Sequence, residues 1–323
     1  MIETFWNICL LHDIGTRDQL LREAVRVVQT RKSLEQQGAA HTSILEPEML
    51  FQWMKQYAGE REFGHFPGDR DLFYRLYQVG KDTDLLDYAV QTIQQDRVTG
   101  GIVVHTSIVE RFKDMCERNL YRTMLIAEVE KYMRGLAETR LYKESFTITL
   151  LTESYIIAKL LKTYFEAYPN VNIIQGSIYQ PLPLQEKFDA ILTIPNFGLK
   201  MDDVEDASIR DSEGVAVNHL LPLLRDTGRI SVTFPPRMMF QTGSVAKWRE
   251  LTNESYPVQS VHMLPDGLFR PYTSVKTYQI EFGKSPTQQV LIGRLKLQKL
   301  SLEPEREISI RSEAFSQLEN WRI

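Results

Sequence analysis

Short apolar segments that alternate with amphipathic helices constrain the fold of this chain more than any other feature. Between residues 122 and 282 the segments typical of strands are RTMLIA, FTITLL, VNII, FDAIL, GRISVTF, VQSVHML and KTYQIEF. The helix pattern SYIIAKLLKTYFEAYP separates the second from the third, and VNHLLPLLRDTG predicts a further helix ending at Gly228. This alternation predicts an α/β fold with a Rossmann-like, mostly parallel seven-stranded sheet, whose ligand crevice lies at the carboxyl ends of the strands.

The chain changes character near residue 100. Upstream, RDQLLREAVRVVQTRKSLEQQ, EPEMLFQWMKQYAGE and DTDLLDYAVQTIQQD place apolar residues at helical spacing. We therefore expect a helical N-terminal domain over residues 1–97 and the α/β domain over residues 98–285. Residues 286–323 form a C-terminal extension with one further strand pattern and a terminal helix pattern.

Composition narrows the functional classes. A formal net charge of −4 and a pI near 6.0 exclude nucleic-acid binding by bulk charge, although they leave room for a local basic groove. The two cysteines form no Cys-x-x-Cys pair and the six histidines are scattered, so we expect no metal site. The N-terminus lacks a basic leader, and no apolar run approaches the ~20 residues of a membrane span. We expect a cytoplasmic protein without membrane association.

Four stretches carry a resemblance to a known family. FDAILTIPNFG is similar to a strand followed by Asn-Pro-Pro-Phe-Gly, and LLPLLRDTGRISVTFPP to a helix, a Gly-Gly turn and a strand. VHMLPDGLFRPYTSVKTYQIEF is similar to Leu-Pro-x-x-x-Phe-x-Pro-Tyr-Thr-x-x-Lys-Thr, which is the most specific match. LLDYAVQTIQQDRVTGGIVVHTSIVERF resembles a helix that leads into Gly-x-Phe-x-Thr-Pro. Residues 80–285 thus resemble the adenine-specific DNA methyltransferases, in particular the modification subunits of type I restriction-modification systems.

The resemblance implies a methyltransferase-type sheet, a helical N-terminal domain and a catalytic loop after the fourth strand. In the family, an Asn side chain and a Pro carbonyl accept hydrogen bonds from the adenine amino group, and an aromatic ring stacks on the flipped base. The aligned residues are Ile194, Pro195, Asn196 and Phe197. The ring is kept, but a branched hydrocarbon replaces the Asn, and Asn196 lies two positions later. Pro195, Asn196 and Phe197 are therefore candidate catalytic residues at a degenerate site.

The cofactor implied by the resemblance is S-adenosyl-L-methionine, and its motifs are altered in the same way. The family's Asp-Pro-x-x-Gly-x-Gly turn is replaced by the residues from Ala127 to Met133, whose side chains fill the space that glycines leave open. Ser177 stands where the family has an Asp near the cofactor's adenine. Glu153 remains where the family has the acid that binds the ribose hydroxyls. An alternative role for Glu153 is to cap the helix that follows it.

A third set of candidates belongs to the segment LFRPYTSVKT. Arg270, Tyr272 and Lys276 combine cationic and aromatic side chains of the kind that contact phosphates and bases. The competing interpretation is a hairpin whose aromatic ring packs under the sheet.

These patterns favour a catalytically degenerate adenine methyltransferase-like protein, or pseudo-methyltransferase. Such a protein would act as a DNA-binding or scaffold subunit of a DNA-modification or defence assembly, with DNA and a specificity-type or second methylase-like subunit as partners. The alternative is an active, S-adenosylmethionine-dependent adenine-specific DNA methyltransferase with an altered active site. A third possibility is that the fold acts on a protein or small molecule.

Overall fold

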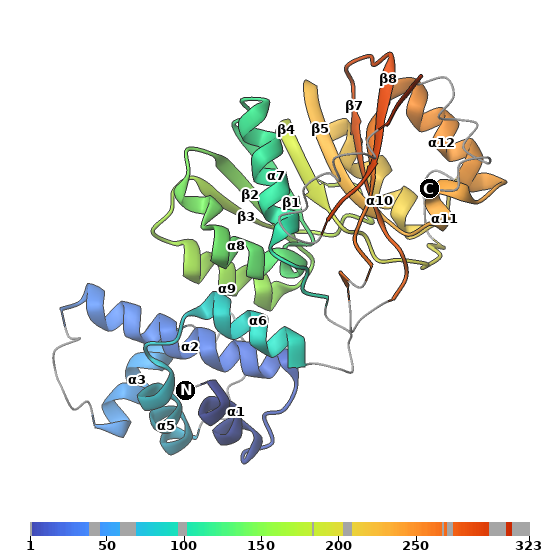
Figure 1. Cartoon of the computed structure of the whole chain (residues 1–323). Coiled ribbons are helices and arrows are strands. Elements are labelled where there is room, and N and C mark those ends of the chain that lie inside the picture. Colours follow the sequence, from blue (N-terminus) through green and yellow to red (C-terminus); the bar gives the residue numbers. More distant parts are fainter. Residues whose placement is uncertain are drawn as a thin grey trace. The chain divides into compact units, whose positions relative to one another are not determined.

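The structure is a computed structural model that describes residues 2–38, 46–58, 69–95, 102–182, 184–202, 209–266, 268–269, 274–296 and 308–311. Its contacts divide the chain into two compact units (Figure 1). The first comprises Met1–Gly101 together with Tyr155–Ala167, and the second comprises Ile102–Ser154 together with Tyr168–Ile323.

The first unit is helical. Its helices are α1 (Ile2–Leu10), α2 (Arg17–Gln36), α3 (Pro47–Tyr57), α5 (Arg70–Gly80), α6 (Leu85–Gln95) and α9 (Tyr155–Phe165). The long helix α2 begins with a capping box, in which Thr16 and Gln19 satisfy each other's backbone N–H groups. Most of its apolar residues are buried, and the ring of Phe5 in α1 meets Tyr88 of α6 edge to face at 5.4 Å. The predicted helical character of this region is confirmed.

Helix α9 joins the N-terminal helices although it lies between two strands in the sequence. The side-chain amide of Gln29 in α2 donates to Thr163 at 3.0 Å, and Lys32 pairs with Glu166 at 3.1 Å. The boundaries that we expected at residues 97 and 285 stay a prediction. The contact division differs from them because α9 buries its apolar face in the first unit.

The second unit contains one mixed sheet, with strand order β3-β2-β1-β4-β5-β7-β6-β8-β9 among the described residues. The strands are β1 (Thr123–Ala127), β2 (Thr147–Thr152), β3 (Val171–Gln175), β4 (Phe188–Thr193), β5 (Leu224–Phe234), β6 (Val258–Met263), β7 (Tyr278–Gly283), β8 (Gln289–Arg294) and β9 (Ile308–Arg311). β3, β2, β1, β4 and β5 are parallel, whereas β7 is antiparallel to both β5 and β6. The predicted α/β class and its seven strands are confirmed, but β8 and β9 extend the sheet to nine.

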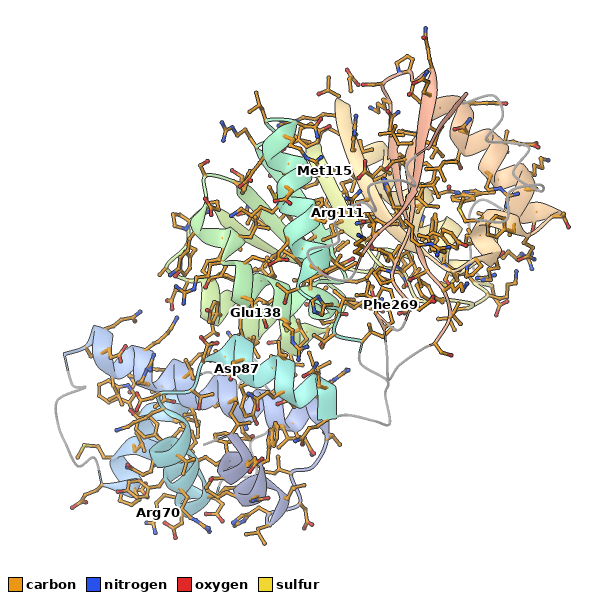
Figure 2. All side chains as sticks on the ribbon, viewed as in Figure 1. Arg70, Asp87, Arg111, Met115, Glu138 and Phe269 are labelled. Atoms are coloured by element: carbon orange, nitrogen blue, oxygen red, sulfur yellow. The ribbon has the colours of Figure 1, made fainter. Side chains whose placement is uncertain are left out.

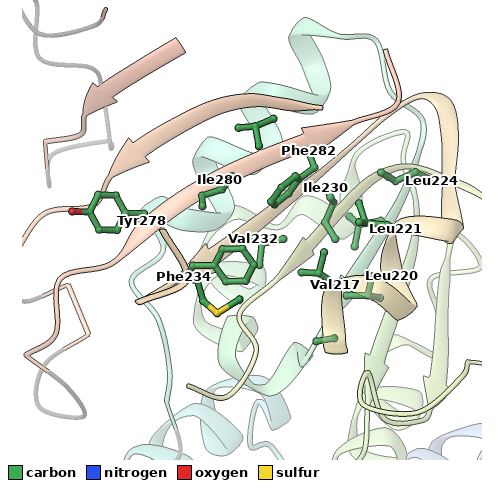
Figure 3. Close-up of a cluster of buried hydrophobic side chains, with 14 of the residues drawn as sticks. Val217, Leu220, Leu221, Leu224, Ile230, Val232, Phe234, Tyr278, Ile280 and Phe282 are labelled. Atoms are coloured by element: carbon green, nitrogen blue, oxygen red, sulfur yellow. The ribbon is translucent and has the colours of Figure 1, made fainter. Parts of the chain in front are cut away.

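Helices cover the two faces of this sheet. α7 (Ser107–Arg118) precedes β1, and the short helix η1 (Val129–Tyr132) and α8 (Met133–Thr139) follow it. α10 (Ser212–Leu220), α11 (Arg237–Phe240) and α12 (Ser244–Ser255) pack on the apolar face of β5, β7 and β6. Figure 3 shows Val217 and Leu220 of α10 beside Ile230 and Val232 of β5. The remaining short helices are η2 (Leu141–Lys143) and η3 (Leu221–Leu223).

One predicted boundary is wrong. The helix expected to continue to Gly228 ends at Leu220, and η3 follows for one turn. Pro222 lacks the N–H group that a continuing helix would need. β5 then begins at Leu224, which pairs with Phe188 of β4. The terminal helix expected in the C-terminal extension lies outside the described residues.

Candidate functional site

The loop that follows β4 is fixed by hydrogen bonds to its backbone. Asn196 N–H donates to the hydroxyl of Tyr179 at 2.7 Å, and its carbonyl oxygen accepts from Ser212 Oγ at 2.7 Å. Gly198 has a φ of +78°, which favours glycine, and donates its N–H to Glu213 Oε1 at 3.0 Å. Pro195 is buried, Phe197 is half-buried and Asn196 is exposed. The loop therefore holds one defined conformation with part of an aromatic ring accessible.

A lysine from the turn after β1 occupies the acceptor groups of this loop. Lys131 Nζ donates to the carbonyl oxygen of Ile194 at 2.5 Å and to Asn196 Oδ1 at 3.0 Å. The same ammonium pairs with Glu128 Oε2 at 2.9 Å, and both side chains are nearly inaccessible to solvent. The candidate residue Asn196 does present an amide oxygen in the site, but a cation of the chain itself already binds it.

The turn after β1 is filled by side chains. Glu128 adopts a left-handed conformation, and η1 and α8 follow without a glycine in the turn. Lys131 stands where the family motif has its first glycine, and Tyr132 and Met133 are fully buried. Burial and the Glu128 carboxylate raise the pKa of Glu130. Bulky side chains and a carboxylate therefore lie where the motif of the resembled family provides bare backbone.

The ribose side of the expected cofactor site keeps polar side chains. Glu153 and Ser177 follow the neighbouring strands β2 and β3, and Ser177 Oγ donates to Glu153 Oε2 at 3.3 Å. Glu153 is exposed, whereas Ala127, at the end of β1, is buried. The structure thus brings two of the three cofactor candidates into contact and leaves a carboxylate that faces solvent.

An ionic cluster beneath the loop was not expected from the sequence. The guanidinium of Arg237 binds the carboxylates of Asp211 and Glu213, both of which are almost completely buried. Lys200 Nζ also donates to Asp211 at 2.8 Å. Burial opposes ionisation of Asp211, but these hydrogen bonds outweigh it and lower its pKa. The only sequence signal was the Pro-Pro-Arg that follows β5, which does not reveal the acidic partners of Arg237.

The nucleic-acid candidates are only partly described. Lys276 is exposed and lies two residues before the start of β7. Arg270 and Tyr272 lie outside the described residues. Phe269, labelled in Figure 2, is buried. Within the described ranges, no group of His, Cys, Asp or Glu side chains could hold a metal ion, and no helix is long and apolar enough to span a membrane.

Comparison with known families places one match on this part of the chain. The model of the family described as N-6 DNA Methylase matches residues 166–318. This part of the chain, just under half of its length, is thus similar to that family. The matched residues include β4, its loop and the Asp211–Glu213–Arg237 cluster, whereas β1 and its filled turn precede them.

Among curated proteins, the methylase subunit of the type I restriction enzyme EcoEI from Escherichia coli is 31% identical over 112 residues. The alignment covers 32% of this chain and 23% of that subunit. The chain therefore matches about a quarter of the length of that relative.

Solved structures show that the fold is shared. The methyltransferase subunit of a type I restriction-modification system from Streptococcus thermophilus has a TM-score of 0.64 at 12% identity, and the superposition covers 98% of this chain and 90% of that one. A chain from a study of complex assembly in a type I system gives 0.61 at 14% identity, with 98% and 88% covered. The predicted methyltransferase-type sheet with preceding helices is confirmed.

Proposed function

We propose that this chain is an N-6 DNA methylase-type subunit of a restriction-modification-like assembly that does not transfer methyl groups. Its role is to contribute the fold, a DNA-binding surface and a docking surface to that assembly. The observation that carries this proposal is the position of the Lys131 ammonium on the acceptor groups of the catalytic loop.

The contacts of Lys131 argue against base methylation. Methyl transfer to adenine needs acceptors that hold the amino nitrogen in line with the methyl donor. The Ile194 carbonyl and the Asn196 amide oxygen accept hydrogen bonds from Lys131 instead. Releasing Lys131 would leave the carboxylate of Glu128 buried without its cation, which costs on the order of 3–5 kcal/mol. An incoming base would have to supply that free energy before any chemistry began.

The cofactor turn supports the same proposal independently. Close approach of backbone amides to a carboxylate requires residues without bulk at the turn. Here Lys131, Tyr132 and Met133 are buried in the turn, and Glu128 adds a negative charge. Loss of cofactor binding and loss of the amide acceptors would each suffice to abolish activity.

The assembly role rests on the resemblance to type I methylase subunits. The E. coli relative is a subunit of a restriction enzyme, and the solved structure at TM-score 0.61 comes from an assembly study. We infer that DNA and a specificity-type or second methylase-like subunit are partners of this chain.

The test is a calorimetric titration of S-adenosylmethionine into the full chain, followed by transfer of labelled methyl groups to unmethylated DNA. We expect no heat at millimolar cofactor, which corresponds to a binding free energy weaker than about 4 kcal/mol. We also expect no labelled adenine, with DNA alone or with a candidate partner subunit. Binding of the chain to DNA without methylation is the expected positive result.

Matched variants make each result specific. Heat from a cofactor bound at the ends of β2 and β3 should disappear in Glu153→Ala. Glu144→Ala, which changes another exposed acidic residue, is the control and should leave the heat unchanged. Methyl transfer that disappears in Phe197→Ala and persists in Phe240→Ala would overturn the proposal.

An active enzyme with an altered site is the second candidate. It is favoured by the exposed Glu153 carboxylate beside Ser177 and by the accessible part of the Phe197 ring. In an active enzyme, the hydrogen bonds of Lys131 to Ile194 and Asn196 must break when the cofactor and the base bind. Lys131→Ala would then raise cofactor affinity, whereas the pseudo-methyltransferase proposal expects no such gain.

A further inference from the structure

A cavity of about 770 Å³ lies on the opposite edge of the sheet from the catalytic loop. It is bounded by the C-terminal part of α7, by the start of β6 and the end of β7, and by the loop from Pro286 to Gln289. The catalytic loop follows the carboxyl end of β4, whereas α7 leads into the amino end of β1. This cavity, called the α7 groove below, is therefore separate from the site described above.

The floor of the α7 groove belongs to a polar sheet face, of which Ser260, His262 and Glu281 line the groove. The strand register places Ser231, Glu281 and Ser260 in one row across β5, β7 and β6, and Thr233, Gln279 and His262 in the next. All six are buried. The alternate rows, which include Val232, Ile280 and Val261, face the hydrophobic core instead. A sheet face packed under a helix is usually apolar, so two buried polar rows need an explanation.

Arginines converge over this floor. Arg111 of α7, labelled in Figure 2, donates to Gln279 at 3.0 Å and bonds to His262 Nδ1 at 3.2 Å. Arg118 and Arg229 also line the groove, and Arg229 lies 3.5 Å from the single lining carboxylate, Glu281. His262 stays neutral, because burial and then Arg111 and Arg118 lower its pKa to about 3. The groove therefore presents an excess of positive charge.

Two hydroxyls of this sheet face, those of Ser260 and Thr233, lack a hydrogen-bond partner within the described part of the chain, and only Ser260 lines the groove. Ser260 is 3% exposed, lines the groove, and its Oγ makes no hydrogen bond within the described part of the chain. A buried hydroxyl without a partner costs roughly 1–3 kcal/mol. Arg118 is exposed and bonds only through Nε, to the carbonyl of Asp114 in its own helix, as far as the structure describes it. Its terminal nitrogens are available to a ligand.

We propose that the α7 groove binds a phosphate group of a ligand through Arg118, Arg229 and Ser260. Guanidinium groups match phosphate oxygens in a two-pronged geometry, and a serine hydroxyl donates a further hydrogen bond. The volume suits a small ligand or one stretch of a chain. The described lining contains no Phe, Tyr or Trp, and its one imidazole, His262, is buried and bonded to Arg111, so the recognised group is the phosphate and not a stacked base. This proposal does not depend on whether the chain transfers methyl groups.

Two probes distinguish the sources of the phosphate. Pyrophosphate represents a small ligand, and a 5′-phosphorylated single-stranded oligonucleotide represents a nucleic-acid backbone. Each is titrated into the full chain at low ionic strength, by calorimetry and by fluorescence anisotropy respectively. Binding of pyrophosphate alone assigns a small phosphate ligand. Binding of the oligonucleotide at the same arginines identifies the ligand as a polynucleotide. The salt dependence of that binding should then weaken when one arginine is removed.

The variants are Arg118→Gln, Arg229→Gln and Ser260→Ala. Lys113→Gln is the matched control, because it removes one positive charge from the same helix, where Lys113 pairs with Glu144 away from the groove. We expect each arginine variant to weaken binding at least tenfold, Ser260→Ala to weaken it several-fold, and Lys113→Gln to leave it unchanged. Arg118 is exposed, so its variant should fold normally.

The proposal is overturned if neither probe binds at millimolar concentration. It is also overturned if Lys113→Gln weakens binding as much as Arg118→Gln, since the effect would then reflect net charge and not the groove.

Discussion

The ammonium nitrogen of Lys131 lies 3.0 Å from the side-chain oxygen of Asn196, a residue 65 positions later in the chain. This contact joins the turn after β1 to the loop after β4. Parallel neighbouring strands place these two turns at the same edge of the sheet, since Ile126 of β1 pairs with Leu192 of β4. Lys131 thereby links the region of the expected cofactor site to the expected catalytic loop.

The first prediction concerns this link. Lys131→Met should lower the free energy of unfolding by about 3–5 kcal/mol, because it leaves the Glu128 carboxylate buried without a cation. It should also increase proteolytic cleavage in the loop from Ile194 to Gly198. Urea denaturation followed by circular dichroism measures the first effect, and limited proteolysis measures the second.

A double variant separates the ion pair from simple packing. Lys131→Met combined with Glu128→Gln removes both charges, so it should recover much of the lost stability. If the double variant is as unstable as the sum of the single ones, the Lys131 contacts are not coupled to Glu128.

Much of the fold could be predicted from the sequence because its signals are local. Each strand of the central sheet is a short apolar run, and β4 is buried along its whole length. β8 and β9 were harder to identify. β8 has exposed residues between its buried ones, as a strand with one covered face does, so its apolar signal is weak. The end of α10 was misjudged because apolar residues continue through Pro222 into β5, and periodicity alone does not separate the two.

The location of the candidate site could be predicted from the sequence, but its contacts could not. The position of Pro195, Asn196 and Phe197 at a strand end follows from the local pattern. The partners of that loop do not, because Tyr179, Glu213 and Lys131 come from other turns and meet it only in the folded chain. The side chains from Ala127 to Met133 were expected to fill the cofactor's space, but the hydrogen bonds of Lys131 to the loop could not be inferred without the register of β1 against β4.

The second prediction concerns the ionic cluster of Asp211, Glu213 and Arg237. Arg237→Gln should destabilise the protein by about 3 kcal/mol, because Asp211 and Glu213 are buried and lose a charged partner. Arg225→Gln is the control. Its partner Asp189 keeps hydrogen bonds from the backbone of Arg122 and Thr123, so we expect a loss below about 1 kcal/mol. Thermal unfolding compares the two, and equal losses would show that the cluster has no special role.

The third prediction concerns the packing of α7 on α8. A Cβ atom at Gly135 would lie 2.3 Å from Val109 Cγ2, so Gly135→Ala should cost about 1–3 kcal/mol through overpacking. Val109→Ala removes Cγ2, the nearest clashing atom, and leaves only Cβ at 2.7 Å, so it should make the double variant more stable than additivity predicts. Chemical denaturation of the four proteins in this cycle measures the coupling, and additive losses would contradict the close contact.

The fourth prediction concerns acid stability. Burial, Arg111 and Arg118 lower the pKa of His262 from 6.5 to about 3 in the folded state. As the pH falls below 6.5, the unfolded chain binds a proton at His262 that the folded chain excludes, so its contribution to stability is present above 6.5 and is lost on the way to pH 3. Between pH 7 and pH 4 the wild type should lose on the order of 3 kcal/mol more than His262→Asn does. Urea unfolding at both pH values measures this difference. An equal loss in the two proteins would mean that His262 is protonated in the folded state, which would place a third cation beside Arg111 and Arg118.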